Sequence, residues 1–377
     1  MQNNIFRKGL IVGLIFLSIM ISTISTSKNI KGSVVEMENN NFYYTYDEFT
    51  DLLKLLQTQH PEIFSYYSLN KTYDGRNIWL VKISDNVSVK ENEPQILIMG
   101  GVHGNEKPGF QAVIYCMKSI VENYTKPAIN ESFTMRIRNI VNSTEIFFIP
   151  MVNPDGIEAF TRKNCRPNKC IFGKTCFRGV DINRNYDYNW EDADKHPLRY
   201  IVIPKTWDDL KILLSGNTTN YPFERTAVRF PLLDFRSPFR SGYYRGPRAF
   251  SENESNAIRN FIEKNNVSIS VDYHIGGEGI GYPRPWSYTH PVDNSTFFSL
   301  AENISKINGY KIGQRPNWSN VSGGFGYWAY SKYGMFSFTI ELCKSMEQNW
   351  NPDEEYLLRL FYAHLLVNLY LAEKATM

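Results

Sequence analysis

Four ionisable residues have the types and the spacing that metal-dependent hydrolysis needs. His103 and Glu106 lie three positions apart, after the apolar run Ile96–Met99 and two glycines. An imidazole and a carboxylate at this spacing on a tight turn can hold one metal ion, and catalytic zinc commonly takes two histidines and a glutamate with one position open. The His-x-x-Glu pattern is common by chance, so it needs support. His274 offers the second imidazole and Glu341 a candidate general base.

Short apolar runs, which we interpret as buried strands, lead to each of these side chains. They are Ile96–Met99 before His103, Val267–Val271 before His274, and Met335–Ile340 before Glu341. Open α/β sheets bind their ligands at the carboxyl ends of the strands. The order of these runs therefore predicts one site at one edge of an α/β sheet.

The remaining patterns complete an α/β order. The further strands that we expect are Tyr66–Leu69, Ile78–Ile83 and Glu145–Val152, the last running into a turn at Asn153–Gly156. The expected helices are Tyr46–His60, Gly109–Asn123, Glu252–Lys264 and Pro352–Lys374. Residues 191–242 are rich in Pro, Arg and aromatic residues without clear periodicity, which indicates a folded insertion or lid.

Composition limits the class of protein. Hydrophobic residues make up 42% and charged residues 21% of the 377 residues, as in globular proteins with a sizeable core. The formal net charge of +3 is too small to indicate a nucleic-acid surface. We therefore expect a globular protein that does not bind nucleic acid.

The first 30 residues differ from the rest. Arg7 and Lys8 precede the uncharged apolar stretch Gly9–Ile24, and small polar residues follow. This order is typical of a signal peptide, but the stretch is also nearly long enough for an N-terminal membrane anchor, and both interpretations stay open. Residues 31–42 would be a linker. Sequons for N-glycosylation support an extracellular, secreted or outer-surface location; they begin at Asn70, Asn86, Asn123, Asn130, Asn142, Asn217, Asn253, Asn266, Asn294, Asn303, Asn317 and Asn320.

From about residue 43 to the C-terminus, with residues 191–242 excluded, the chain resembles the zinc metallocarboxypeptidases of the carboxypeptidase A/B type. The motifs that carry the resemblance are HGNE at 103–106, NPDG at 153–156, GVDINRN at 179–185, Y-x-G-P-x-x-F-S-E-x-E at 244–254, DYH at 272–274 and FTIEL at 338–342. The resemblance implies a single catalytic domain, 43–377, with a mixed, mostly parallel central β-sheet flanked by helices.

The resemblance also implies roles for the metal-site residues. His103, Glu106 and His274 would bind one zinc ion, and Glu341 would be the general base that activates water. Asp181 matches the family's carboxylate that holds the first histidine. Such a carboxylate fixes the tautomer and the orientation of the ring.

Further residues match the family's substrate site. Arg162 corresponds to the arginine that polarises the scissile carbonyl. Asn183 and Arg184 correspond to the pair that binds the terminal carboxylate of the substrate, for which a guanidinium fork is well suited. The implied partners are therefore the C-termini of peptides or proteins.

Some positions depart from the family pattern. Ser319 stands where the family has a mobile tyrosine, and Asn105 where it often has an arginine. Gly326 occupies the usual floor of the specificity pocket, and the segment Trp318–Trp328 contains no acidic residue. A neutral or aromatic C-terminal side chain is therefore the expected substrate, because a cationic one would be desolvated without a counter-charge. A local disulfide is expected among Cys165, Cys170 and Cys176.

Three functions remain in competition at this point. The first is a secreted or membrane-anchored zinc carboxypeptidase. The second is a zinc amidase on the same scaffold, acting on other amide-linked tails. The third is a non-catalytic binding protein, which the presence of all four residues of the metal site and base disfavours.

Overall fold

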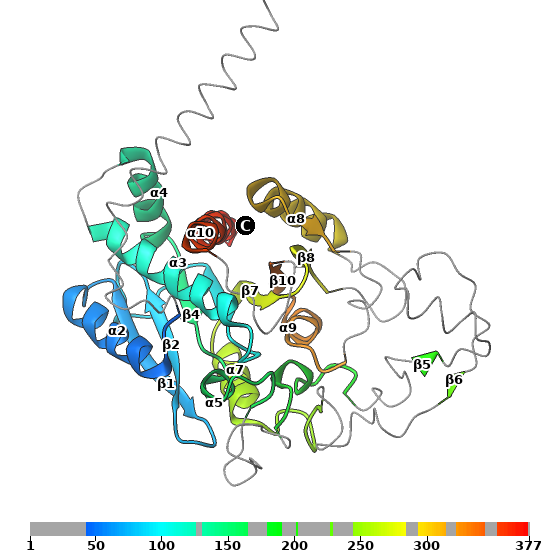
Figure 1. Cartoon of the computed structure of the whole chain (residues 1–377). Helices are drawn as coiled ribbons and strands as arrows, with labels where there is room; N and C mark the ends of the chain where they lie inside the picture. Colours follow the sequence, from blue (N-terminus) through cyan, green and yellow to red (C-terminus); the bar gives the residue numbers. More distant parts are fainter. Residues whose placement is uncertain are drawn as a thin grey trace, which may run out of the picture. The chain divides into compact units, whose positions relative to one another are not determined.

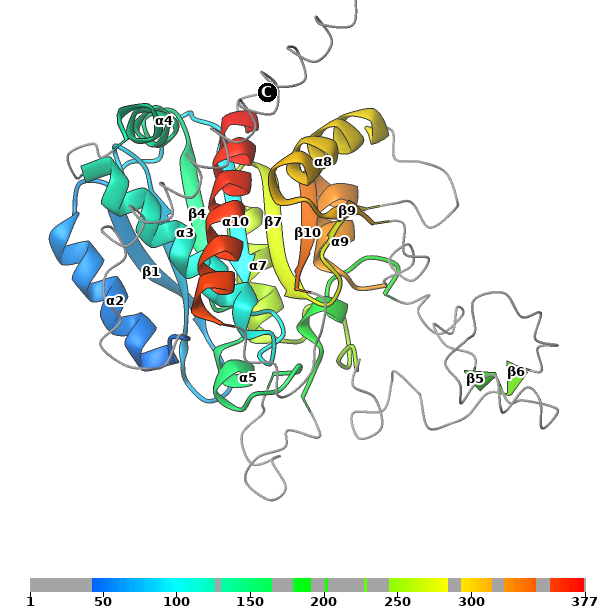
Figure 2. The same cartoon turned by 45° about the horizontal axis from the view of Figure 1, so that its top comes forward.

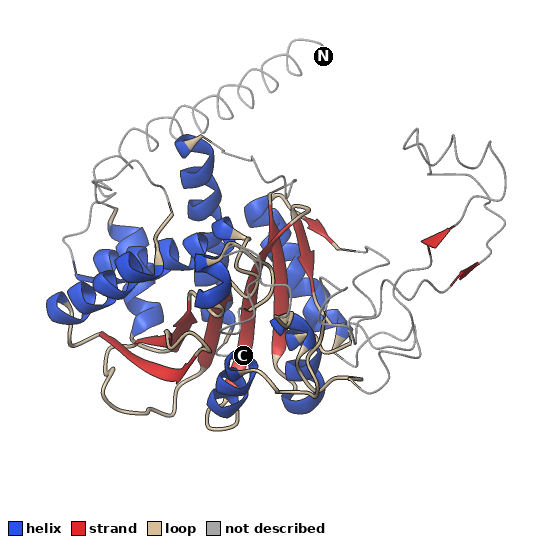
Figure 3. Cartoon of the chain, turned by 60° about the horizontal axis from the view of Figure 1, so that its bottom comes forward, coloured by secondary structure: helices blue, strands red, loops and turns tan. Residues whose placement is uncertain are grey.

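The computed structural model describes residues 43–125, 130–164, 179–190, 201–202, 227–228, 244–283, 293–313, 322–343 and 353–375. Figure 3 shows a central sheet with helices on both faces. The strands are β1 (Phe64–Lys71), β2 (Asn77–Ile83), β3 (Gln95–Gly100), β4 (Glu145–Ile149), β5 (Ile201–Val202), β6 (Ala227–Val228), β7 (Val267–Ile275), β8 (Gly279–Gly281), β9 (Lys311–Ile312) and β10 (Phe336–Leu342). The helices are α2 (Tyr46–Gln59), α3 (Lys107–Thr125), α4 (Glu131–Val141), α5 (Pro154–Glu158), the 3-10 helix η1 (Ile182–Arg184), α7 (Asn253–Ile262), α8 (Asn294–Asn308), α9 (Phe325–Tyr333) and α10 (Glu354–Lys374).

The main sheet has the strand order β1-β2-β4-β3-β7-β10-β8-β9. Its centre, β4-β3-β7-β10, is parallel throughout. The pairs β1–β2, β2–β4 and β8–β10 are antiparallel. The structure thus confirms the predicted mixed, mostly parallel sheet in a single domain.

Successive side chains of the central strands point to opposite faces of the sheet, and both faces are apolar. On one face, Leu97 and Phe147 pack with Phe261 of α7, in a buried cluster that also includes Trp328 of α9. On the other face, α3 and α10 pack against each other and against β3 and β7. In Figure 2, α10 lies in front of the sheet and α7 behind it, and Figure 1 locates the same elements along the chain. Parallel strands covered on both faces are expected to be apolar in continuous runs, as the fully buried β3 and β4 are.

The strands and helices expected from the sequence are present, but the ends of two strands differ, and α4, α5, α8, α9, β8 and β9 were not expected. We expected β7 and β10 to end before His274 and Glu341, but both residues lie inside their strands. The helix α2 begins at a capping box, in which Thr45 and Glu48 satisfy each other's backbone N–H groups.

Several expectations fall on parts of the chain that the structure does not describe. They are the signal peptide or anchor, the linker at 31–42, the three clustered cysteines and Ser319. Of residues 191–242, only the two-stranded antiparallel pair of β5 and β6 is described. None of the described helices has both the length and the apolar composition that spanning a bilayer requires.

Candidate metal centre and active site

The loop that carries His103 is held against the NPDG loop by close backbone contact. A Cβ atom at Gly104 would lie 1.9 Å from the carbonyl carbon of Gly156, so only glycine fits there. Asn153 Nδ2 donates a hydrogen bond to the carbonyl oxygen of Val102 at 3.2 Å, and the Asn153 N–H donates to Gly101 at 3.1 Å. Two loops that are distant in sequence therefore form one unit at the carboxyl ends of β3 and β4.

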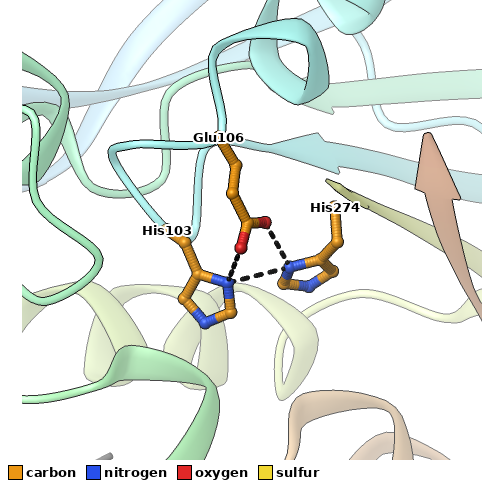
Figure 4. Close-up of side chains that lie close together, drawn as sticks. All are labelled: His103, Glu106 and His274. Atoms are coloured by element: carbon orange, nitrogen blue, oxygen red, sulfur yellow. Dashed lines mark hydrogen bonds and ion pairs between the residues drawn. The ribbon is translucent and has the colours of Figure 1, made fainter. Parts of the chain in front are cut away.

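The structure brings His103, Glu106 and His274 together, as the sequence predicted (Figure 4). Glu106 Oε1 lies 2.9 Å from His103 Nδ1, and Glu106 Oε2 lies 2.9 Å from His274 Nδ1. The two Nδ1 atoms are 3.0 Å apart. All three side chains are buried. Figure 4 shows the carboxylate directed toward both rings.

This donor set fits a zinc ion. Two imidazole nitrogens 3.0 Å apart need a shared proton or a shared cation between them, because both otherwise present lone pairs. Two histidine nitrogens and a glutamate carboxylate are a common ligand set of catalytic zinc. The residues that would hold the ion are His103 and His274, through Nδ1, and Glu106.

Each histidine has a second carboxylate on its far nitrogen. Asp181 Oδ1 lies 3.2 Å from His103 Nε2, and Asp272 Oδ2 lies 2.8 Å from His274 Nε2. We expected the first contact, but assigned no role to Asp272. The sequence signal was available, since residues two apart on a strand share one face of the sheet. Both carboxylates are placed to fix the tautomer and the orientation of a ligand.

Two of these carboxylates are held in the ionised form. Burial raises the pKa of Glu106, but His103 and His274 outweigh it and hold that pKa below its usual range. Burial likewise raises the pKa of Asp181, while Arg162, His103 and Arg184 bring it well below its usual value. Metal ligands must be deprotonated, so the site is charged correctly for a cation.

Glu341 lies beside His274 because of strand register. The two residues are paired positions on the parallel strands β10 and β7. Burial, together with nearby Glu106, raises the pKa of Glu341 to about 7, although His274 opposes this. Its Oε2 atom is buried and has no hydrogen-bond partner among the described residues. A carboxylate with a pKa near neutrality and a vacant oxygen is suited to accept a proton.

Three residues that we assigned to the substrate lie around η1 and the loop before it. Arg162 donates from Nε to Asp181 at 2.9 Å and lies 3.4 Å from Glu106 through Nη1. Asn183 places Nδ2 3.2 Å from His274 Nε2, and its Oδ1 accepts the N–H of Phe325. Arg184 Nη1 donates to the carbonyl oxygen of Asn183 at 2.7 Å. Arg162 and Asn183 therefore lie at the metal centre, and Arg184 is close enough to help lower the pKa of Asp181.

A buried acidic pair supports this region. Asn164 Nδ2 donates to Glu252 at 2.8 Å and to Glu254 at 3.3 Å, while its Oδ1 accepts the N–H of Val180, next to Asp181. Glu252 and Glu254 are fully buried. Burial raises the pKa of Glu254 to about 8. The sequence identified the motif that contains these glutamates but not their role in holding the chain on both sides of the site.

Two cysteines are described, and both are buried free thiols. Cys116 lies in α3, and Cys343 follows β10. Gly326, the expected pocket floor, lies in the first turn of α9. A Cβ atom there would approach Ser337 Oγ at 3.0 Å.

The fold and the site together define a mixed α/β protein with a candidate metal centre at one edge of its sheet. A family model described as zinc carboxypeptidase matches residues 49–202 and 236–363, which is most of the chain. The chain belongs to the zinc carboxypeptidase family.

Individual relatives agree with this assignment. The zinc carboxypeptidase of Saccharothrix mutabilis subsp. capreolus is 36% identical over 157 residues, which cover 39% of this chain and only 33% of that protein. The carboxypeptidase N catalytic chain of Homo sapiens is 22% identical over 357 residues, which cover 84% of this chain and 68% of that protein. The crystal structure of carboxypeptidase A from Helicoverpa armigera aligns with a TM-score of 0.65 at 20% identity, covering 90% of this chain and 76% of that chain. This last likeness concerns the fold.

Proposed function

We propose that the protein is a zinc carboxypeptidase that removes the C-terminal residue of peptides or proteins. The observation that carries this proposal is the convergence of His103, Glu106 and His274 on one point beside Glu341. A zinc ion bound there supplies a Lewis acid and lowers the pKa of a coordinated water.

The chain's own residues would divide the remaining work. Glu341 takes the proton of the attacking water and returns it to the leaving amine, for which a pKa of about 7 is suitable. Arg162, which lies against the ligand Glu106, donates to the carbonyl oxygen as negative charge develops on it. Asp181 and Asp272 hold the two histidine rings.

Recognition of the terminal carboxylate falls to Asn183 and Arg184. The guanidinium of Arg184 can donate two parallel hydrogen bonds to a carboxylate, which suits this role. The segment around Gly326 has no acidic residue, which supports a preference for neutral or aromatic C-terminal side chains. The export signal or anchor and the sequons support action outside the cell.

Two measurements test the proposal. Purified protein should contain one zinc ion per chain, and it should cleave a peptide with a free C-terminus but not the same peptide amidated at its C-terminus. Equal cleavage of both peptides would favour the amidase alternative. Protein that holds zinc but hydrolyses neither peptide nor other acyl amides would indicate a binding protein.

A further inference from the structure

A second group of acidic side chains lies at the end of the sheet opposite the zinc site, where β3 and β4 begin. Asp85, Glu91 and Glu93 place carboxylate oxygens within 4.8 Å of one another. Glu145 adjoins them, since its Oε1 accepts the N–H of Glu91 at 3.2 Å. We call these four residues, with Gln95, the acidic cluster. It shares no residue with the zinc site.

The charge of the acidic cluster is poorly compensated. Lys82 forms an ion pair with Glu145 at 2.6 Å, and within the described part of the chain it is the one cation paired with these four carboxylates. The nearby Lys90 donates instead to the carbonyl oxygen of Lys264. Burial raises the pKa of Glu93, and repulsion from Glu91, Asp85 and Glu145 adds to that shift. Lys82 also lowers the pKa of Glu93, but one lysine among four carboxylates leaves the fully ionised cluster with an excess of negative charge.

A buried amide oxygen is the independent sign of a missing ligand. Gln95 is only 2% exposed, and its Oε1 has no hydrogen-bond partner among the described residues. Its Nε2 donates to Glu145 Oε2 at 2.5 Å, and the two residues are register partners on parallel strands, so this amide lies against the Glu145 carboxylate of the acidic cluster. The Oε2 atoms of Glu91 and Glu93 are also buried without partners. Buried acceptors without donors are rare in folded proteins, and a bound water or ion is a common partner for them.

We propose that the acidic cluster binds one calcium ion through Asp85, Glu91 and Glu93, with Glu145 and Gln95 completing its oxygen environment. Calcium takes six to eight oxygen ligands in adaptable geometry, whereas magnesium requires a compact octahedron and keeps several waters. The cluster contains no histidine or cysteine, which disfavours zinc. The ion ties the loop between β2 and β3 to the amino ends of β3 and β4. It would therefore stabilise the strand whose other end carries the zinc ligands.

The test uses the full-length, zinc-loaded protein in buffer freed of calcium on a chelating resin. Calcium chloride is titrated by calorimetry, and Tm is measured with calcium and with magnesium at equal ionic strength. We expect one calcium per chain with a Kd of about 10⁻⁵–10⁻³ M. At a 100-fold excess over Kd, Tm should rise by roughly 5 °C. Absence of a saturable calcium site, or an equal effect of magnesium, would overturn the proposal.

The double variant Glu91→Gln/Glu93→Gln gives a sharper outcome because it keeps the shape of the side chains. Without calcium it should melt above the wild-type protein, since two repelling charges are gone; with calcium it should melt below it. Its affinity for calcium should fall at least tenfold. Glu302→Gln, at an exposed carboxylate of α8 paired with Lys306, is the matched control and should leave the calcium response unchanged. A double variant that binds calcium as tightly as the wild type would refute the assignment.

Discussion

Replacement of Asp272 by Asn tests the one ligand-orienting contact that sequence reasoning did not anticipate. Asp272 is 2% exposed, and its Oδ2 lies 2.8 Å from His274 Nε2. Asn has the same shape and keeps an oxygen that can accept a hydrogen bond, but it removes the negative charge. The variant therefore isolates the electrostatic part of the contact.

The expected effect follows from the strength of the two kinds of hydrogen bond. A hydrogen bond to a charged group contributes about 1.5–3 kcal/mol and a neutral one about 1 kcal/mol. The difference, roughly 0.5–2 kcal/mol, corresponds to about a 2- to 30-fold loss of zinc affinity. This overlaps the roughly 10–100-fold loss that is usual when the partner of a metal-binding histidine is removed.

Competition with a chromophoric chelator measures the zinc affinity of wild-type and variant protein at one pH. Ser270→Ala is the matched control, since Ser270 lies on β7 with Asp272. The change removes a buried hydrogen bond to Ser337 of β10 without touching the carboxylate. Circular dichroism should show both variants folded. If Asp272→Asn binds zinc within twofold of the wild type, the charge of Asp272 has no part in holding His274 as a ligand.

Three further predictions concern the base, the buried acidic pair and the carboxylate site. Glu341→Gln should retain zinc but lose about 10²–10⁴-fold in kcat, because the amide cannot accept a proton; a near-normal kcat would place the base elsewhere. The pKa of Glu254, raised by burial to about 8, means that its protonated form stabilises the fold fully below the unfolded pKa of 4.5 and that this contribution is lost as pH rises toward 8. Denaturant unfolding should therefore show Glu254→Gln gaining stability over the wild type as pH rises from about 4.5 to 8, and a constant difference would contradict this. Arg184→Ala should raise KM for peptides with a free C-terminus, by an amount equivalent to about 2–5 kcal/mol, without weakening zinc binding; an unchanged KM would move carboxylate recognition to another residue.

The elements that carry the metal ligands were predictable because their apolar runs are continuous. The strand β3 and the helix α3 follow the expected pattern, and the turn between them delivers His103 and Glu106. The ends of β7 and β10 were not predictable in the same way. Polar residues end an apolar run in the sequence, but the backbone continues to pair with the neighbouring strands.

Some helices were missed for identifiable reasons. In α8, Phe297, Leu300, Ala301 and Ile304 follow helical spacing, so this helix was within reach of pattern analysis. The helix α9 was hidden because it follows directly after two glycines, is rich in aromatic residues and has little amphipathic character. The sharing of Asn164 by two buried glutamates depends on contacts between distant segments, which no local pattern encodes.

The pairing of Glu341 with His274 has a consequence for engineering this scaffold. The two side chains project from neighbouring strands, so their separation is set by the inter-strand spacing of roughly 4.8 Å and not by the chain that connects them. Within the connection between β7 and β10, the residues outside β8, β9, α8 and α9 could therefore be changed to alter which substrates are admitted, while the chemical groups keep their places. We expect laboratory evolution of this protein to be most productive in that connection, and least productive in the two strands themselves.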